Sequence, residues 1–352
     1  MDELFCKLWF SIIKIKDSLK LELLNSGLTP EMLLCMDERD YVSNGISLFE
    51  AQDIKNSKNT KACEETYEYI NKEDIRILLY TDKEYPEQLK NIYDPPAALF
   101  VKGQEVDFTS CLAIVGARKA SDYGKTVAYK LSKELASRGI TIVSGLARGI
   151  DTCAHQGSLD AEGVTAAVMG SGFRYIYPPQ NKRLFENICS SGCVITEYLP
   201  DIPPYAGNFP KRNRIISGVS KGVIIVEAGE KSGSLITARL ALEQGRDVFA
   251  VPGNILSPTS QGTNSLIKDG AKPVTCIGDI LEEYGVISVD MTGLHMDEKE
   301  KLVYEVVKSG GGNLEGICSM LPMLKIEELL AVLSTLECKG AVKRIYGGYY
   351  IC

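Results

Sequence analysis

From residue 111 onward, short apolar runs alternate with stretches that have the spacing of amphipathic helices, and this alternation permits few architectures. The runs lie at residues 112–115, 141–143, 164–169, 194–196, 223–226, 248–251 and 274–275. Between the first two, the stretch YGKTVAYKLSKELASRG places Val127, Leu131 and Leu135 on one helical face and ends at Gly139. Continuous apolar strands separated by helices form parallel sheets that are covered on both faces. The pattern therefore predicts an α/β domain with a doubly wound, mostly parallel sheet.

The segments on either side of this domain have different patterns. Residues 1–71 contain Leu and Met at helical spacings, and they predict a small N-terminal helical domain. The α/β domain then takes residues 72–285, and residues 286–296 form a linker. Residues 297–352 contain three helical patterns followed by alternating residues around a Gly-Gly turn, which predicts a C-terminal winged helix.

Charge is distributed unevenly along the chain. The whole sequence of 352 residues has a formal net charge of −7. Residues 111–285 carry 19 Lys and Arg against 16 Asp and Glu, a net of +3, so the flanks together carry −10. The α/β domain is therefore the part suited to an anionic partner.

Composition also restricts where the protein is expected to act. The sequence has no apolar run of about 18 residues and no cleavage site of a signal peptide, so we expect neither a membrane span nor export. Its eleven cysteines are scattered without a CxxC pair. This spacing predicts no metal site and favours reduced thiols in a cytoplasmic protein.

Glycine-rich turns follow the predicted strands, and cations lie in or just after these turns. Ligands of open parallel sheets bind outside the carboxyl ends of the strands, so the turns mark the expected site. Glycine lets backbone N–H groups approach a phosphate, and the start of the helix that follows favours an anion. The residues selected by this argument are Gly116, Arg118, Arg148, Lys182, Lys231, Ser232, Gly233 and Ser234.

A second group of cations, Lys211, Arg212 and Arg214, precedes the run at residues 223–226 on a predicted helix. Such a cluster is more often a solvated helix face, but here the helix begins near the same sheet edge. Because Arg212 and Arg214 are two residues apart, their side chains cannot share one face. We expect Arg212 to be a solvated contact to the anion, and Arg214 to pair with an acid such as Glu227 or Glu197. Repeated cations at one edge predict a groove that follows a polyanion.

Aromatic residues fall in or beside the same loops. They are Phe173, Tyr175, Tyr177, Phe185, Tyr198, Tyr205 and Phe209. Sites for single-stranded nucleic acid use aromatic rings to stack bases, so this clustering suits bases better than a lone phosphate.

Catalytic and cofactor motifs are absent from the sequence. The triplet Gly170-Ser171-Gly172 lacks the third glycine of GxGxxG, and Glu230 precedes Lys231 where a Walker loop needs glycine, so we predict no nucleotide cofactor. His155 lies four residues after Asp151 on a predicted helix, a pairing that most often stabilises the helix. Glu197 and Glu227 end strands, where they could act as acids or bases, bind helix N-termini or pair with arginines.

Six ordered motifs give the chain a family resemblance. They are IVGARKASDYG, SGLARGIDTCAHQGSL, YPPQNKRL, NFPKRNRIISGVSKGVIIVEA, SGSLITARLALEQGRDVFAVPG and GTNSLIKDGAKPV. Together they closely resemble the DNA-processing protein A family, also called Smf, from about residue 75 to residue 285.

The resemblance implies an extended Rossmann-like fold that binds single-stranded DNA without a nucleotide cofactor and forms a homodimer. It implies a recombination mediator that protects incoming strands during natural transformation and helps to load the recombinase RecA. It also implies that Arg118 contacts DNA, with Lys182, Arg212 and Arg214 as further candidates in the same groove.

Two other functions fit the sequence less well. The lysine-decarboxylase-like phosphoribohydrolases share a similar sheet and cleave nucleoside monophosphates, but their motif P-G-G-x-G-T-x-x-E is replaced here by EAGEKSGSLITA. A transcription factor would read duplex DNA through the winged helix, but residues 297–352 carry 7 bases against 8 acids. We therefore expect a binding protein and no enzyme, with a C-terminal domain that serves protein interaction or regulation.

Overall fold

The computed structural model describes residues 2–57, 61–284, 297–308, 312–338, 341–345 and 348–351. The chain folds into two compact units, Met1–Leu281 and Glu282–Cys352. The predicted linker at residues 286–296 lies outside the described residues. No helix among the described residues is long and apolar enough to cross a membrane.

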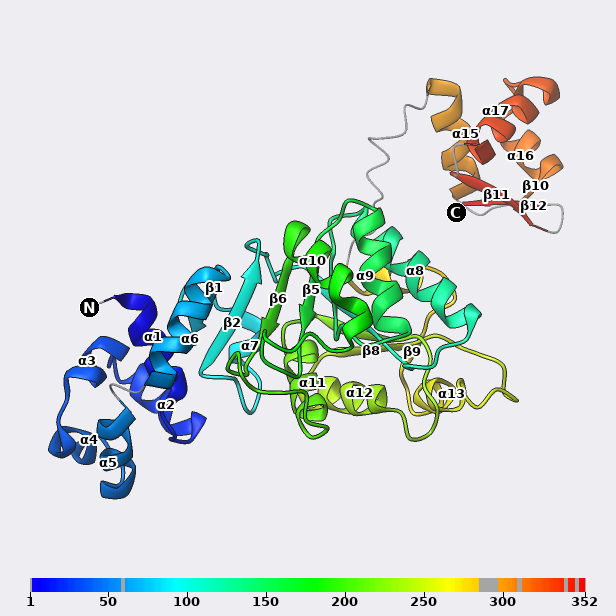
Figure 1. Ribbon diagram of the computed structural model, residues 1–352. Helices are drawn as coiled ribbons and strands as arrows, with labels where there is room; N and C mark the ends of the chain where they lie inside the picture. Colours follow the sequence, from blue (N-terminus) through cyan, green and yellow to red (C-terminus); the bar gives the residue numbers. More distant parts are fainter. Residues whose placement is uncertain are drawn as a thin grey trace. The chain divides into compact units, whose positions relative to one another are not determined.

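A single large sheet forms the centre of the first unit (Figure 1). Its strands, as far as the chain is described, are β1 (Ile75–Leu79), β2 (Ala98–Gly103), β3 (Cys111–Val115), β4 (Thr141–Ser144), β5 (Thr165–Val168), β6 (Cys193–Thr196), β7 (Gly222–Ile225), β8 (Asp247–Ala250) and β9 (Lys272–Pro273). They are ordered β1-β2-β6-β5-β4-β3-β7-β8-β9. All neighbours from β6 to β9 pair in parallel, whereas β2 is antiparallel to both β1 and β6. This confirms the mostly parallel, Rossmann-like sheet.

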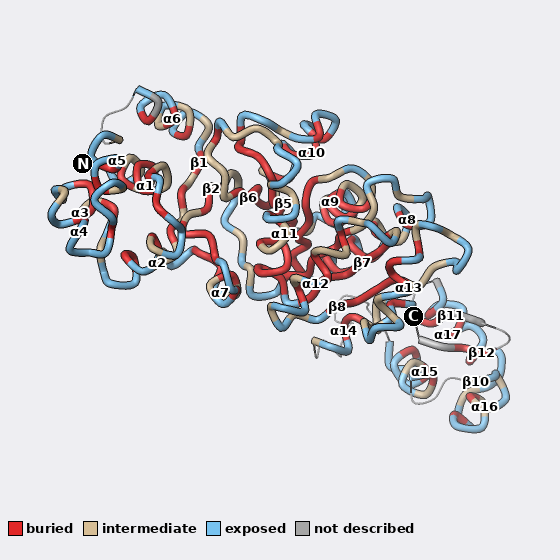
Figure 2. Tube along the Cα trace, turned by 90° about the horizontal axis from the view of Figure 1, so that it is seen from below, coloured by how far each residue is buried: buried red, intermediate tan, exposed pale blue. Residues whose placement is uncertain are grey.

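Helices cover both faces of the sheet. They are α7 (Glu87–Lys90), α8 (Asp122–Ala136), α9 (Ile150–Asp160), α10 (Lys182–Ser191), α11 (Asn208–Gly218), α12 (Gly233–Glu243), α13 (Gln261–Lys268) and α14 (Gly278–Leu281), with a 3-10 turn η1 at Pro179–Asn181. Helices α7, α11 and α12 share one apolar core with the sheet. Figure 2 shows the central strands buried, as expected for strands covered on both faces.

The order of the strands reverses between β3 and β7. The chain builds outward from β3 through β4, β5 and β6, then crosses back by α11 and continues on the other side of β3 with β7 and β8. Loops that leave β3 and β7 at their carboxyl ends therefore diverge to opposite sides. Such a switch point leaves a crevice in which open α/β sheets bind ligands.

Six helices are described ahead of the sheet, and the first and last of them, α1 and α6, pack against β1 at its edge. They are α1 (Glu3–Ile12), α2 (Asp17–Asn25), α3 (Pro30–Cys35), α4 (Glu38–Ser43), α5 (Leu48–Ser57) and α6 (Lys61–Lys72). Trp9 and Phe10 of α1 belong to the same apolar core as Ile77 of β1. The helices predicted for residues 1–71 are present, and a continuous core joins them to the sheet.

The second unit has its own apolar core and small sheet. Its elements are η2 (Glu282–Tyr284), α15 (Glu298–Lys308), β10 (Gly312–Asn313), α16 (Leu314–Met320), α17 (Ile326–Cys338), β11 (Val342–Ile345) and β12 (Gly348–Ile351). Val303, Leu329 and Leu333 lie in the core, and the strands are ordered β10-β12-β11. Three helices and an antiparallel strand pair match the sequence pattern, while the assignment as a winged helix stays a prediction.

Candidate functional site

A groove of about 760 Å³ occupies the switch point of the sheet. Its walls come from the loop after β3, the loop after β7, and the starts of α11 and α12. Seven of the residues selected from the sequence line it: Gly116, Arg118, Arg212, Lys231, Ser232, Gly233 and Ser234. The turns at the carboxyl ends of the strands thus border a concave surface. We refer to it as the groove.

Two glycines let the loop after β3 lie against the loop after β4. A Cβ at Gly116 would lie 2.6 Å from Cγ1 of Ile150. A Cβ at Gly149, whose φ is +77°, would lie 2.3 Å from the carbonyl oxygen of Ala117. Side chains at either position would force the loops apart. The close packing leaves Arg118 and Lys119 exposed at the groove.

Aromatic rings and a guanidinium meet on one wall. The ring of Phe209 lies 5.7 Å from that of Tyr177, and the guanidinium carbon of Arg118 lies 5.1 Å from the centre of the Phe209 ring. An arginine over an aromatic face is held flat by a cation–π contact, while its exposed N–H groups stay available to an anion. The wall combines a positive charge with surfaces on which bases can stack.

The opposite wall is the N-terminus of α12. Ser232 caps this helix of 11 residues, and its hydroxyl lies 2.8 Å from the hydroxyl of Ser234. Lys231, just before the cap, is exposed at the groove. The positive end of a helix dipole beside an exposed ammonium favours a phosphate at this wall.

Arg212 lies beneath the groove and is only 3% exposed. Its Nη1 atom donates hydrogen bonds to the carbonyl oxygens of Gly145, at 2.7 Å, and Val168. Burial lowers the pKa of Arg212 to about 10, which leaves it charged at neutral pH. The expectation of a solvated contact is therefore wrong: the side chain turns inward to satisfy carbonyls at the ends of β4 and β5.

Asp151, at the start of α9, accompanies this buried cation. Its carboxylate accepts hydrogen bonds from the backbone N–H groups of Gly145, at 3.1 Å, and Ala147, at 3.3 Å. Burial raises the pKa of Asp151, and the charge of Arg212 opposes that change. Asp151 thus accepts from backbone N–H groups of the loop after β4, and Arg212 donates to a carbonyl oxygen of the same loop. Together the two side chains hold that loop in place.

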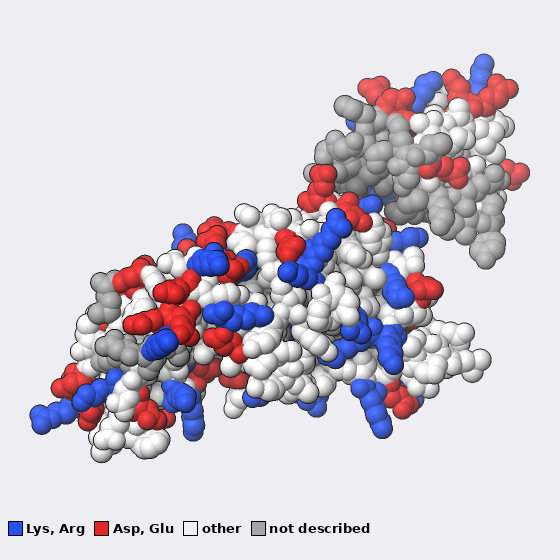
Figure 3. All heavy atoms as spheres, viewed as in Figure 1, with Lys and Arg blue, Asp and Glu red and all other residues white. Residues whose placement is uncertain are grey.

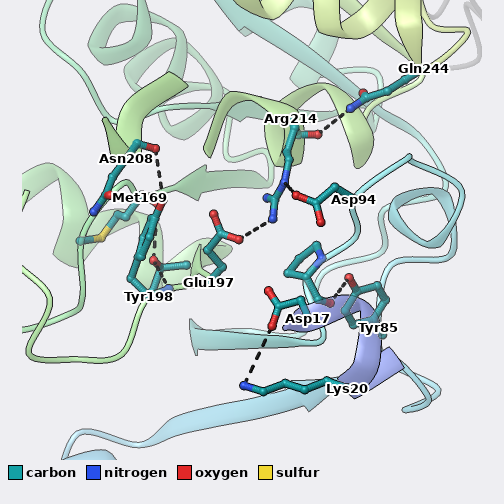
Figure 4. A network of polar contacts seen from close by, with 12 residues as sticks. Asp17, Lys20, Tyr85, Asp94, Met169, Glu197, Tyr198, Asn208, Arg214 and Gln244 are labelled. Carbon is teal, nitrogen blue, oxygen red and sulfur yellow. Dashed lines mark hydrogen bonds and ion pairs between the residues drawn. The ribbon is translucent and has the colours of Figure 1, made fainter. Parts of the chain in front are cut away.

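Arg214 pairs with acids, as its spacing from Arg212 predicted (Figure 4). It does not line the groove, so its place among the DNA-binding candidates of the family resemblance is not supported. Its guanidinium lies 2.5 Å from a carboxylate oxygen of Glu197 and 3.3 Å from one of Asp94. Burial alone would lower the pKa of Arg214, but these two carboxylates raise it overall. Arg214 thus ties α11 to the end of β6 and to the loop before β2.

The remaining predicted cations lie beyond the groove. Arg148 donates a hydrogen bond of 3.1 Å to the side-chain oxygen of Gln180, and Lys182 begins α10. The side-chain amide of Asn181 joins their two loops by donating to the carbonyl oxygen of Leu146 at 2.9 Å. Lys211 is exposed on α11 and does not line the groove.

Sequence reasoning missed several lining residues, among them Lys119, Asn213 and Thr237. Lys119 follows Arg118 in the same turn and could have been included on that ground. Thr237 lies one helical turn after Gly233, so the spacing of α12 was the available signal. No local signal marks Asn213, whose amide faces the carbonyl oxygen of Gly233 at 3.3 Å across the groove floor.

The groups that could have served acid–base chemistry are engaged elsewhere. Glu227 accepts hydrogen bonds from the backbone N–H of Ser121 at 2.8 Å and from its hydroxyl at 2.5 Å, which places this carboxylate at the N-terminus of α8. His155 lies 2.7 Å from the hydroxyl of Thr165 in place of pairing with Asp151. No group of three His, Cys, Asp or Glu side chains within the described ranges is placed to hold a metal ion.

Surface charge agrees with the asymmetry of the sequence. Figure 3 shows acidic side chains gathered around α6 and β1, whereas Lys and Arg are more frequent over the middle of the unit, where acidic side chains are also present. An anionic ligand would meet less repulsion at the α/β part of this unit.

Comparisons with known proteins agree with these features. The family model of DNA recombination-mediator protein A matches residues 76–285. DNA processing protein DprA of Bacillus subtilis is 46% identical over 220 residues, which cover 62% of this chain and 74% of that protein. A crystal structure of DNA processing protein A from Streptococcus pneumoniae is 38% identical, with a TM-score of 0.63, and the match covers 79% of this chain and 95% of the other. DNA processing protein A from Helicobacter pylori, whose structure addresses its single-stranded DNA binding mode, is 30% identical, with a TM-score of 0.55 and coverage of 60% and 96%.

Proposed function

Because this chain belongs to the DNA recombination-mediator protein A family, we propose that it binds single-stranded DNA in the groove and acts as a recombination mediator. The observation that carries the proposal is the pairing of Arg118 with the Phe209 ring, opposite the N-terminus of α12 and Lys231. Positive groups on both walls receive phosphates, and the rings beside Arg118 receive bases. A duplex offers no exposed base faces to such a wall, so single strands are the better ligand.

We infer that Arg148 and Lys182 extend this path across the adjoining loops, since Asn181 holds those loops together. We also propose that the chain works as a homodimer and passes its strand to the recombinase RecA during natural transformation. The family membership supports both proposals. Loading can be measured as RecA ATP hydrolysis on single strands already coated by a single-strand-binding protein, with and without this chain.

The protein is expected to bind mixed-sequence single strands more tightly than duplex, whether or not ATP is present. The logarithm of the affinity should fall with the logarithm of the salt concentration, by about 0.7 for each phosphate neutralised. Arg118→Ala and Lys231→Ala should each weaken binding by ~1–3 kcal/mol and lower that slope by about one phosphate. Fluorescence anisotropy over a salt series measures both quantities.

Lys221→Ala is the matched control for these variants. Lys221 is exposed just before β7, at the edge of the sheet opposite the groove, so its removal should leave affinity and slope unchanged. A preference for duplex would contradict the proposal. So would an affinity that does not respond to salt.

Hydrolysis of nucleoside monophosphates is not expected. Glu227 opens the segment EAGEKSGSLITA, which stands where a phosphoribohydrolase would have its motif. This residue is buried, and both of its carboxylate oxygens accept hydrogen bonds from Ser121 at the start of α8. Glu227→Gln should therefore lower the melting temperature because it weakens that cap. Chromatography of adenosine monophosphate incubated with the parent protein should detect no free base; release that Glu227→Gln abolishes would establish the enzyme instead.

A further inference from the structure

Three exposed tyrosines lie in the loops after β5 and β6, both of which contribute residues to the groove. Tyr175 and Tyr177 follow β5, with 43% and 42% of their surface exposed, and Tyr205 follows β6, with 61% exposed. We call these three residues the aromatic rim. Tyr177 lines the groove, and Tyr205 stands between Pro204 and Ala206, which also line it. The rim is thus continuous with the proposed DNA site.

The two loops that carry the rim are fastened to each other. The N–H of Gly172 donates to the carbonyl oxygen of Ile202 at 2.8 Å, and the N–H of Arg174 donates to that of Pro200 at 3.2 Å. The Arg174 guanidinium also lies 2.6 Å from the carboxylate of Asp201. The rim is therefore preorganised, and binding there would not first have to order the loops.

The one cation at this edge, within the described residues of the two loops, is already engaged. Besides Asp201, the guanidinium of Arg174 contacts the ring of Tyr69 on α6, at 3.9 Å from the ring centre. A strand that crosses the rim therefore meets ring faces and little available positive charge. Contact there would be made by bases and not by phosphates.

We propose that Tyr205 is a base-stacking residue that extends the single-stranded DNA site beyond the groove, so that the strand leaves over the aromatic rim. This inference rests on the proposed function. Stacking on a ring needs only the face of a base, so the contact is tolerant of sequence and independent of salt. It differs in this respect from the contact of Arg118, which neutralises a phosphate.

The test compares Tyr205→Ala with Tyr93→Ala, in which a fully exposed tyrosine is removed from the loop before β2. Tyr205→Ala should weaken binding of a long thymidine oligonucleotide at least about fivefold, since one stacked base contributes on the order of 1 kcal/mol or more. The salt slope and the melting temperature should not change. Tyr205→Phe should bind like the parent, because the ring face remains.

Oligonucleotides with an abasic residue scanned along the strand complete the test. One abasic position should weaken the parent as much as Tyr205→Ala does, and should weaken Tyr205→Ala no further. The inference is overturned if Tyr205→Ala binds as tightly as Tyr93→Ala. It is also overturned if Tyr205→Ala loses the same affinity relative to the parent whichever position of the oligonucleotide is abasic. Either result leaves the proposed function intact, as long as the parent binds single strands and Arg118→Ala binds them more weakly than the parent does.

Discussion

Replacing Arg212 by alanine is expected to lower the free energy of unfolding by about 3–5 kcal/mol, the cost of leaving a nearby buried charge uncompensated. The substitution would leave the carbonyl oxygens of Gly145 and Val168 without their donor. It would also leave the buried carboxylate of Asp151 without the nearby positive charge. Urea denaturation followed by circular dichroism measures the change.

Lys211→Ala is the control for this substitution, because Lys211 precedes Arg212 on the same helix and is exposed. It should change stability by no more than about 0.5 kcal/mol. Arg212→Lys should fall between the two, since an ammonium keeps the charge but cannot reproduce the planar geometry of the guanidinium. If Arg212→Ala is as stable as the parent yet fails to bind DNA, Arg212 is a direct contact after all.

The inward turn of Arg212 marks a limit of sequence reasoning. The spacing of Arg212 and Arg214 correctly separated their directions, and pairing of Arg214 with Glu197 is confirmed at 2.5 Å. Which arginine enters the protein depends on what stands beneath α11, namely Gly145 and Val168, more than forty residues earlier in the chain. No local pattern contains that information.

The sheet was more predictable because its strands are buried on both faces. Continuous apolar runs located β3 to β8 to within about one or two residues, and the alternation with helices predicted parallel pairing. The last strand is displaced: β9 covers Lys272–Pro273, whereas the apolar run lies at 274–275. It is a two-residue edge strand, in which burial imposes little hydrophobic pattern.

Convergence of the turns at one edge followed from the rule for parallel strands, and it brought Arg118 and Lys231 to one groove. The contact between Arg118 and Phe209 could not be predicted in the same way. It joins the loop after β3 to the first turn of α11, and their separation depends on how α11 crosses the sheet. Sequence reasoning gave the charges and the rings, and tertiary packing decided which of them meet.

Acid is expected to destabilise this protein through His155. The hydroxyl of Thr165 donates to the carbonyl oxygen of Ile142 at 2.7 Å, so Nδ1 of His155 must donate to that hydroxyl, and Nε2 has no hydrogen-bond partner among the described residues. Burial, together with the nearby charge of Arg212, lowers the pKa of His155 from 6.5 to about 3. Below pH 6.5, His155 is therefore protonated in the unfolded chain but stays neutral in the native protein.

Stability from the neutral imidazole is complete above pH 6.5 and declines as the pH falls toward 3, by about 1.4 kcal/mol for each pH unit. Between pH 6.5 and pH 5 the loss should reach about 2 kcal/mol. The raised pKa of Asp151 acts in the opposite direction, because the native carboxylate then binds its proton more tightly than the unfolded one. The contribution of His155 must therefore be read as a difference between two proteins, not from the parent alone.

His155→Asn provides that difference, since its amide can still donate to Thr165 but does not titrate. Unfolding free energies of parent and variant, measured by urea denaturation at half-unit steps from pH 7.5 to pH 5, should converge by about 2 kcal/mol toward the acid end. Whatever constant stability the substitution itself removes does not affect this convergence. Parallel curves for the two proteins would mean that His155 accepts its proton in the native state, and that the charge of Arg212 does not reach it.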